Sequence, residues 1–258
     1  MVSVIISHYN NVANLAIVLN ALSKQSVSGF EVIVSEDGQD EKTKAFLATH
    51  TYPFPLQHTT QEDIGFRKNR ILNTSVSASK GSFLVFIDGD CIPHKHFVKA
   101  YQNVEHSNKI CYGRRVMLSE KLTTKLQEKM QFDSLSLFDL ILHKAKSIKE
   151  GIYSPLLPLN FQKRGLMGCN WGIQKKLLFQ VNGFDEDYVY ATVGEDDDID
   201  WRLEGIGLKK HSVKNKAIVY HLHHKRGYDL EGSEINLKIF RKRKEENQFV
   251  CKNGISKS

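Results

Sequence analysis

Two carboxylates separated by a single glycine stand directly after a strongly apolar segment of this chain. Asp88, Gly89 and Asp90 follow the run at 83–87, and acids with one residue between them lie on the same side of an extended chain, roughly 6–7 Å apart. A turn at the glycine can bring both toward one hard cation, and carboxylates with imidazoles suit Mn²⁺ or Mg²⁺. Because Asp-x-Asp also occurs by chance in many loops, its place after a buried strand is what favours a metal site.

A second acidic group follows Gly194 and consists of Glu195, Asp196, Asp197 and Asp198. Four adjacent carboxylates repel one another, so burying them together is costly unless a positive group offsets them. A helix N-terminus favours acids by about 0.3–1 kcal/mol each, which accounts for one or two of them. A cleft carboxylate with a raised pKa is a natural general base for a sugar hydroxyl and contributes ~10²–10⁴ in rate.

Three histidines near the end of the last predicted strand, His221, His223 and His224, could add nitrogen ligands. On a strand, His221 and His223 point to one side and His224 to the other. If this strand returns to the Asp-Gly-Asp turn, one imidazole completes the metal coordination. We favour His221 and leave His223 as the alternative.

The elements that must position these residues alternate between strand and helix. Apolar strands are predicted at 2–6, 30–34 and 82–87. A helix near 15–22 separates the first two strands, and helices near 41–49 and 64–78 separate the second from the third. Continuous apolar strands of this kind indicate an α/β fold, a central, mostly parallel sheet flanked by helices. Ligands bind at the carboxyl ends of such strands. Polar residues gather there, as the loops at 7–11, 36–38 and 88–90 show.

The remaining chain is predicted to complete the same domain. Helices are expected near 96–105, 174–181 and 195–204, one or two helices at 119–149, and strands at 109–117, 208–213 and 217–222. Residues 156–165 are a candidate lid over the site. The interpretation is one catalytic domain at 1–232, with a nucleotide-binding half at 1–93 and an acceptor and catalytic half at 94–232. A basic tail at 233–258 follows, as a helix or as disordered chain.

Composition and charge exclude several classes of protein. The chain has 258 residues, 41% of them hydrophobic, and a net charge of +7, of which the last 21 residues carry seven bases and two acids. Because the body is nearly neutral, we expect no nucleic-acid partner. No apolar run approaches the ~18 residues of a membrane span, and the N-terminus does not read as a secretory signal. We expect a cytoplasmic protein with four reduced cysteines, and a peripheral contact of the basic tail with the inner face of the membrane is a further hypothesis.

The order of these motifs resembles the GT-A fold glycosyltransferases, specifically the inverting family 2 type. The resemblance rests on FRKNRILN at 66–73, DGDCIP at 88–93, GCNWGI at 168–173, VNGFD at 181–185 and GEDDDI at 194–199. These segments look like the β-1,4-galactosyltransferase pattern, and together with the strand at 219–221 they are similar to bacterial chondroitin polymerase domains. The resemblance covers roughly residues 1–225.

The resemblance implies a role for each matching residue on the donor side. A loop and nearby charged groups would hold the nucleotide of a UDP-sugar: Ser7, His8, Tyr9, Glu36, Asp37, Arg67, Lys68, Asp88 and Gly89. Mn²⁺ or Mg²⁺ would be held against the diphosphate by Asp88, Asp90 and His221. The chain has His8 where the broad family commonly has a small residue, which leaves the donor sugar open.

On the acceptor side, the resemblance implies that Asp196 deprotonates the acceptor hydroxyl and that Glu195 faces the sugars. Contacts with sugar or acceptor would come from Asn170, Trp171 and Asp197, with a packed loop tryptophan as the alternative for Trp171. The implied function is metal-dependent, inverting transfer of a hexose or N-acetylhexosamine to a glycan or lipid-linked glycan in polysaccharide, lipopolysaccharide or capsule biosynthesis. The alternatives are a glycoside hydrolase using two of the acids, and a non-catalytic binding module with the same fold.

Overall fold

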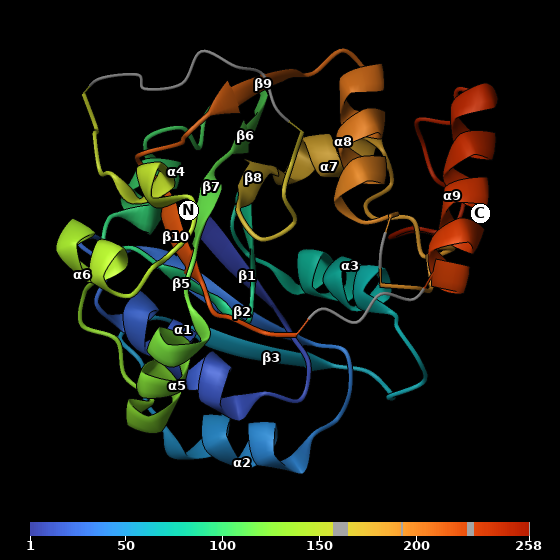
Figure 1. Ribbon diagram of the computed structural model, residues 1–258. Coiled ribbons are helices and arrows are strands. Elements are labelled where there is room, and N and C mark those ends of the chain that lie inside the picture. The colour runs from blue at the N-terminus through green and yellow to red at the C-terminus, as the bar shows by residue number, and fades with distance from the viewer. Residues whose placement is uncertain (157–164, 192, 226–229, 258) are drawn as a thin grey trace.

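The computed structural model of the protein describes residues 1–156, 165–191, 193–225 and 230–257 (Figure 1). Its centre is a seven-stranded sheet in the order β3-β2-β1-β4-β8-β6-β9. The candidate lid at 156–165 falls almost entirely outside the described residues. The strands of this sheet are β1 (Val2–His8), β2 (Phe30–Glu36), β3 (Leu56–Thr60), β4 (Phe83–Asp88), β6 (Lys109–Tyr112), β8 (Trp171–Gln174) and β9 (Lys209–Ser212).

The sheet is mostly parallel, as predicted. β1 pairs in parallel with β2 and β4, β2 with β3, and β6 with β9, while β8 runs antiparallel to both β4 and β6. Strands β3 and β8 are not among the predicted elements, because their short polar or glycine-containing sequences lack a continuous apolar run. The predicted strand at 109–117 is interrupted at Gly113 and forms β6 and β7 in different sheets.

Alternate residues of the central strands enter two separate cores, one on each face of the sheet. Val4 and Ile6 pack in one core with α1 (Val12–Ser23), while Ile5 packs in the other with Leu72 of α3 (Lys68–Ala78). Because both faces are covered, nearly every residue of β1 and β2 is buried. The sheet therefore gives a rigid platform whose carboxyl edge carries the polar loops.

A second, three-stranded sheet has the order β5-β10-β7 and joins distant parts of the chain. Its strands are β5 (Cys91–Pro93), β7 (Arg114–Met117) and β10 (Ile218–His221). The antiparallel pairing of β5 with β10 sets His221 opposite Cys91. This register brings the last strand of the fold to the residue that follows Asp90.

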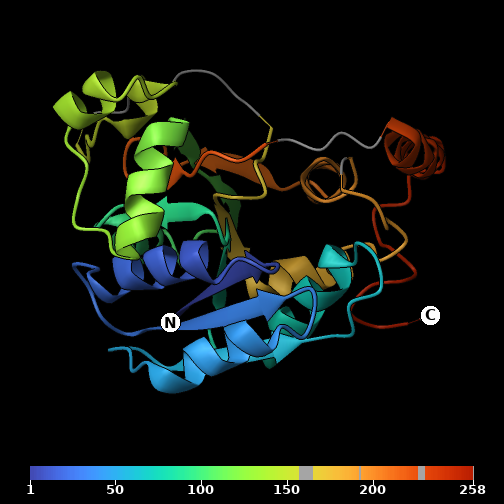
Figure 2. The same cartoon turned by 60° about the horizontal axis from the view of Figure 1, so that its bottom comes forward.

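The other helices surround these sheets and extend to the C-terminus (Figures 1 and 2). They are α2 (Glu41–Thr49), α4 (Phe97–Gln102), α5 (Glu120–Lys129), α6 (Leu137–Leu142), η1 (Ile148–Gly151), α7 (Lys175–Gln180), α8 (Asp196–Gly205) and α9 (Leu230–Glu245). The segment after 232 is thus helical as far as Glu245, which is the first of its two predicted alternatives. It packs on the body of the fold, since Asn236 and Cys251 are buried.

Candidate active site

Parallel pairing sets the ends of three strands side by side and so gathers the first polar residues. Ser7 of β1 is in register with Asp88 of β4, and His8 is in register with Glu36 of β2. Gly89 lies so close to β1 that its N–H donates to the Ser7 carbonyl at 2.7 Å, and a Cβ on Gly89 would stand 3.0 Å from the same oxygen. The sheet register alone therefore builds this edge of the site.

Lys68 connects this edge to the second acidic group. Its Nζ lies 2.8 Å from Asp88 Oδ1 and 2.7 Å from Glu195 Oε1. Burial raises the pKa of Glu195 to about 7, and the neighbouring acids Asp88 and Asp196 add to this effect while Lys68 opposes it. Burial alone would raise the pKa of Asp88, but the Lys68 ammonium holds it below its usual value. These groups line a small cavity together with Ser7 and Gly168.

A separate cluster joins Asp90 with two histidines. Asp90 Oδ2 lies 3.5 Å from His221 Nε2 and 3.3 Å from His224 Nε2, and one ligand atom of each residue lies within 4.8 Å of the others. The Nδ1 atom of His221 is buried and has no partner among the described residues. A carboxylate and two imidazoles whose Nε2 atoms face it suit a divalent cation of the Mn²⁺ type.

His224 is a site residue that the sequence pattern placed on the wrong side. β10 ends at His221, so strand alternation no longer governs the following residues. His223 instead donates its backbone N–H to Thr123 Oγ1 at 2.8 Å. Asp88 joins Lys68 rather than this cluster. The structure therefore divides the two acids of the Asp-Gly-Asp turn between two groups.

The residues expected to hold the nucleotide lie along one margin of the sheet. Asp37 accepts hydrogen bonds from the Gln61 side chain at 2.7 Å and from the backbone N–H of Arg67 at 2.8 Å. Burial lowers the pKa of His8 to about 4, so its imidazole is neutral, and its Nε2 lies 3.0 Å from Thr43 Oγ1. Tyr9 is exposed and available for stacking.

Glu36 belongs to the interior of this margin. Its side chain is fully buried and lies 2.7 Å from His58 Nε2. The Glu36 carboxylate also accepts the N–H of Asp40 at the start of α2. In this arrangement Glu36 supports the loop that carries Asp37. Its geometry favours this supporting role over the predicted direct contact with the nucleotide.

The acidic run divides into residues with different environments. Asp196, the first residue of α8, accepts the backbone N–H of Gly168 at 3.1 Å, and Asp197 is exposed. Asp198 is fully buried, where it accepts hydrogen bonds from Arg202 Nε at 2.6 Å and from the Tyr188 hydroxyl at 3.1 Å. The positive group that offsets the buried acids is thus Arg202 for Asp198 and Lys68 for Glu195.

The loop before these acids is held by residues that sequence reasoning did not identify. Asn69 of α3 donates to the carbonyls of Asp185 at 2.7 Å and Gly194 at 3.1 Å. Asn236 of α9 donates to the carbonyls of Tyr190 at 2.9 Å and Val193 at 2.7 Å. Asn69 and Asn236 could have been identified only as asparagines whose buried amides need backbone carbonyls as hydrogen-bond acceptors.

Arg243 of α9 holds the start of the same loop by charge. Its Nε lies 3.2 Å from Asp185 Oδ2, and its NH2 group pairs with Asp187. One member of the basic cluster at 241–244 therefore belongs to the folded body.

The burial of Asn170 and Trp171 does not favour the predicted contact of these residues with a sugar. Asn170 is fully buried, donates to the carbonyls of Arg114 and Ala217, and accepts from the Tyr101 hydroxyl at 2.7 Å. Trp171 is 1% exposed and stacks on Phe86 with ring centroids 4.5 Å apart. Both residues complete the interior beneath the site, and the packed tryptophan is the alternative that holds.

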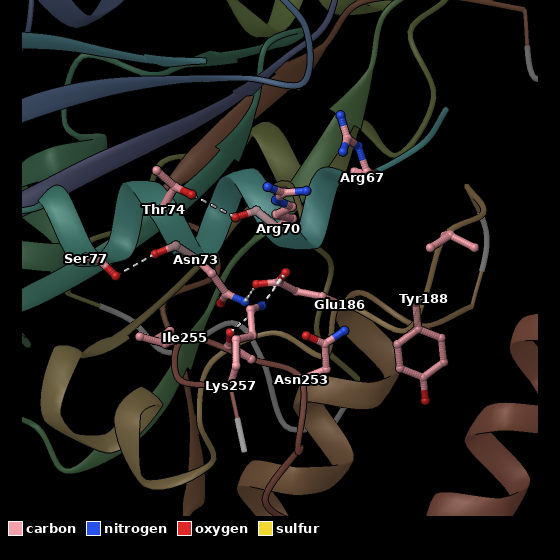
Figure 3. A pocket seen from close by; sticks show the side chains of 12 residues that line it. Arg67, Arg70, Asn73, Thr74, Ser77, Glu186, Tyr188, Asn253, Ile255 and Lys257 are labelled. Carbon is pink, nitrogen blue, oxygen red and sulfur yellow. Dashed lines mark hydrogen bonds and ion pairs between the residues drawn. The ribbon is translucent and has the colours of Figure 1, made fainter. Parts of the chain in front are cut away.

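A larger cavity of about 500 Å³ lies outside this site (Figure 3). Figure 3 shows Arg70 and Thr74 of α3, with Arg67 just before this helix, on one side and Glu186 and Asn253 on the other. The acids and histidines of the two clusters do not line it. We therefore place the chemistry at the strand ends and not in this cavity.

The fold and the acids at its strand ends define the class of protein, a GT-A fold glycosyltransferase. S. aureus TarS 1–349 in complex with UDP superposes with a TM-score of 0.63 at 17% identity, covering 93% of this chain and 64% of that one. The mannosyltransferase PcManGT from Pyrobaculum calidifontis, in complex with GDP-Man and Mn²⁺, gives 0.58 at 17% identity over 88% and 58% of the two chains. At these identities the likeness establishes the fold.

The chain belongs to glycosyl transferase family 2, whose sequence model matches residues 3–178. Chondroitin synthase from Escherichia coli is 26% identical over 236 residues, which are 85% of this chain and 34% of the synthase. Glycosyltransferase AglE from Haloferax volcanii is 33% identical over 100 residues, 38% of this chain and 33% of AglE. The chain thus spans about a third of the length of these curated relatives.

This membership confirms the resemblance seen in the sequence and overturns the alternative of a glycoside hydrolase. Among the described residues, no helix is both long enough and apolar enough to cross a membrane. The cytoplasmic location stays a prediction. All four cysteines are free and buried, which agrees with the expected thiols.

Proposed function

We propose that this chain transfers a hexose or N-acetylhexosamine from a UDP-sugar to a glycan acceptor, with inversion and with the help of a divalent cation. The observation that carries the proposal is that the cluster of Asp90, His221 and His224 and the group of Lys68, Asp88 and Glu195 both lie at the Asp-Gly-Asp turn after β4. The names of relatives agree with it, since chondroitin synthase and hyaluronan synthase are polymer-forming enzymes. A role in polysaccharide, lipopolysaccharide or capsule biosynthesis follows from this proposal.

A cation of the Mn²⁺ or Mg²⁺ type would be held by Asp90, His221 and His224, with Asp88 beside them. When bound, it would neutralise the charge that develops on the leaving diphosphate. Lys68 pairs with Asp88. The same ammonium group would also pair with a diphosphate that the cation holds, because lysine binds phosphate as a point charge.

Residues 1–93 would bind the nucleotide. The exposed ring of Tyr9 offers a surface for the base, and Asp37 and the neutral His8 offer hydrogen-bonding groups beside it. The Arg67 N–H is already committed to Asp37, so α3 and the loop after β2 form one unit. This unit would position the donor without contributing to bond breaking.

Asp196 is our proposed base. It makes no ion pair with any residue that the structure describes, whereas Glu195 is paired with Lys68. The Lys68 ammonium occupies the Glu195 carboxylate, which leaves Asp196 as the acid of this pair with no cation in contact with it in the described part of the chain. Asp196 would take the proton of the acceptor hydroxyl as that oxygen attacks the sugar carbon opposite the departing diphosphate, which gives inversion in one displacement.

Release of UDP from a panel of UDP-sugars, measured with Mn²⁺, with Mg²⁺ and with EDTA, tests the proposal. We expect cation-dependent release that increases when an acceptor glycan is added. Asp90→Asn should lower it about 10²-fold or more, since the metal's charge stabilisation is lost. Glu204→Gln, on the far exposed end of α8, is the matched control. UDP binding by calorimetry with no turnover for any donor and acceptor would instead support the non-catalytic module.

A further inference from the structure

An exposed apolar surface lies on the part of the chain that the active site does not use. Four of the six residues of α6 are apolar and exposed, with Phe138 at 70%, Leu142 at 61%, Ile141 at 58% and Leu137 at 48%. Only Leu140 of this helix is buried and holds it to the fold. We call Leu137, Phe138, Ile141 and Leu142 the α6 patch. Large apolar side chains grouped in this way mark a contact surface.

Lysines are frequent in the segment that carries the α6 patch. From 121 to 149 the chain has six lysines and three acids. Two of these acids are already engaged, since Asp133 pairs with Lys24 and Asp139 forms the capping box of α6 with Ser136. All six lysines are exposed. Lys125 lies next to the end of α6, and Lys144 and Lys146 follow that helix directly. The surface is therefore apolar at its centre and positive at its rim.

We propose that the α6 patch and its lysine rim rest on an anionic lipid surface. Apolar side chains beside lysines are the combination by which surface helices enter the boundary of a bilayer, because the apolar groups leave water while the ammonium groups meet lipid phosphates. A second copy of the chain fits less well. In a two-fold interface the same surface meets itself, which would bring the two lysine rims together.

The basic tail is the weaker candidate for this contact. Arg241, Lys242 and Lys244 of α9 are exposed but stand on the side of the molecule opposite α6 (Figures 1 and 2). Arg243, the fourth base of that cluster, is paired with Asp185 and Asp187. We therefore expect the membrane contact at the helices between β7 and β8 and not at the C-terminal segment.

The α6 patch is also tied to the active site. Lys125 of α5 lies 3.4 Å from His143 at the end of α6, and Thr123 of α5 accepts the N–H of His223 beside the metal cluster. A bilayer under α6 would hold this site close to acceptors that are anchored in the same surface. The lipid contact itself does not depend on the proposed transfer reaction.

Vesicle sedimentation of the full chain tests this inference. The probes are vesicles of phosphatidylcholine alone and vesicles of phosphatidylcholine with an equal part of phosphatidylglycerol. We expect binding to the anionic vesicles, reduced roughly tenfold by Phe138→Ser with Ile141→Ser and by Lys144→Glu with Lys146→Glu. Because all four side chains are exposed, the variants should fold, which circular dichroism checks.

Arg241→Ala with Lys242→Ala on α9 is the matched control and should leave binding unchanged. Equal sedimentation of the α6 variants and the unmodified chain would overturn the inference, as would loss of binding in the α9 variant alone. Light scattering that shows a dimer dissociated by Phe138→Ser with Ile141→Ser would assign the patch to a second copy. UDP release with a soluble acceptor should be the same in all variants, so this result stands apart from the test of the transferase activity.

Discussion

The two sides of the active site are built by different means. On the donor side, the strand register of β1, β2 and β4 sets Ser7, Glu36 and Asp88 at one edge, and backbone pairing alone fixes their spacing. On the acid side, the loop that leads to Glu195 and Asp196 has no strand to hold it and depends on side chains from α3 and α9. Donor affinity should therefore change little when residues far from the site are substituted, whereas the position of the base should change with them.

Asp196→Asn should have the largest effect and separate the two sides cleanly. Removing a general base lowers kcat by ~10²–10⁴-fold, while the donor edge stays intact and UDP affinity is retained. UDP release and calorimetric UDP binding measure the two quantities on the same sample. A variant that keeps most of its turnover would remove Asp196 from the role. If Glu195→Gln is then inactive, Glu195 is the base.

Asn236→Ala should have the next largest effect, although Asn236 is remote in sequence from every strand-end residue. Its amide holds the carbonyls of Tyr190 and Val193, and small displacements of a reacting group cost up to about 10²-fold. We expect kcat to fall roughly tenfold to a hundredfold with UDP affinity unchanged. Glu234→Ala, an exposed residue of the same helix, is the control. Equal losses of kcat and of UDP affinity would indicate general unfolding and contradict a positioning role.

The same contrast explains what could be predicted from the sequence. Continuous apolar runs identify β1, β2 and β4, and the polar residues that follow these runs form the donor edge. The apolar pattern and the place of a polar residue after it are therefore enough to predict this edge. His224, Asn69 and Asn236 could not be found in this way. Their roles come from a strand that ends at His221 and from hydrogen bonds between residues more than 40 positions apart. The packing of Trp171 could not be predicted for the same reason, since its stacking on Phe86 depends on the antiparallel strand β8, which has no clear sequence signal.

The protonation of Glu195 gives a smaller effect, which depends on pH. Its pKa of about 7 means that the carboxylate takes up a proton as the pH falls below that value, and the ion pair with Lys68 is then lost. We expect the rate of transfer to fall by at most about tenfold per pH unit below this point. The pH profile of Glu195→Gln should lack the inflection. A wild-type profile that is flat between about pH 6 and 8 would show that the pair does not affect turnover.

Glu31 lies at the amino end of β2, away from the donor edge, and should affect stability alone. Its carboxylate accepts hydrogen bonds from Ser3 Oγ at 2.6 Å, from the Lys80 N–H at 2.6 Å and from the Gln57 side chain at 3.0 Å. Burial opposes ionisation, but these hydrogen bonds lower the pKa of Glu31 overall. A carboxyl group whose folded pKa is lowered stabilises the fold above its unfolded pKa, and this stability is lost as the pH falls.

Glu31→Gln should therefore lower the free energy of unfolding by about 1–3 kcal/mol at neutral pH, because its amide cannot accept all of these donors. The difference from the unmodified chain should shrink at an acidic pH below the usual pKa of a glutamate carboxyl group, where this stabilisation is lost. Urea unfolding at both pH values measures this. Turnover and UDP affinity of the folded variant should be unchanged, since backbone pairing still fixes the carboxyl edge of β2. A shift in UDP affinity would show that the two ends of the strand are coupled, and that the donor side is no more independent of remote residues than the acid loop.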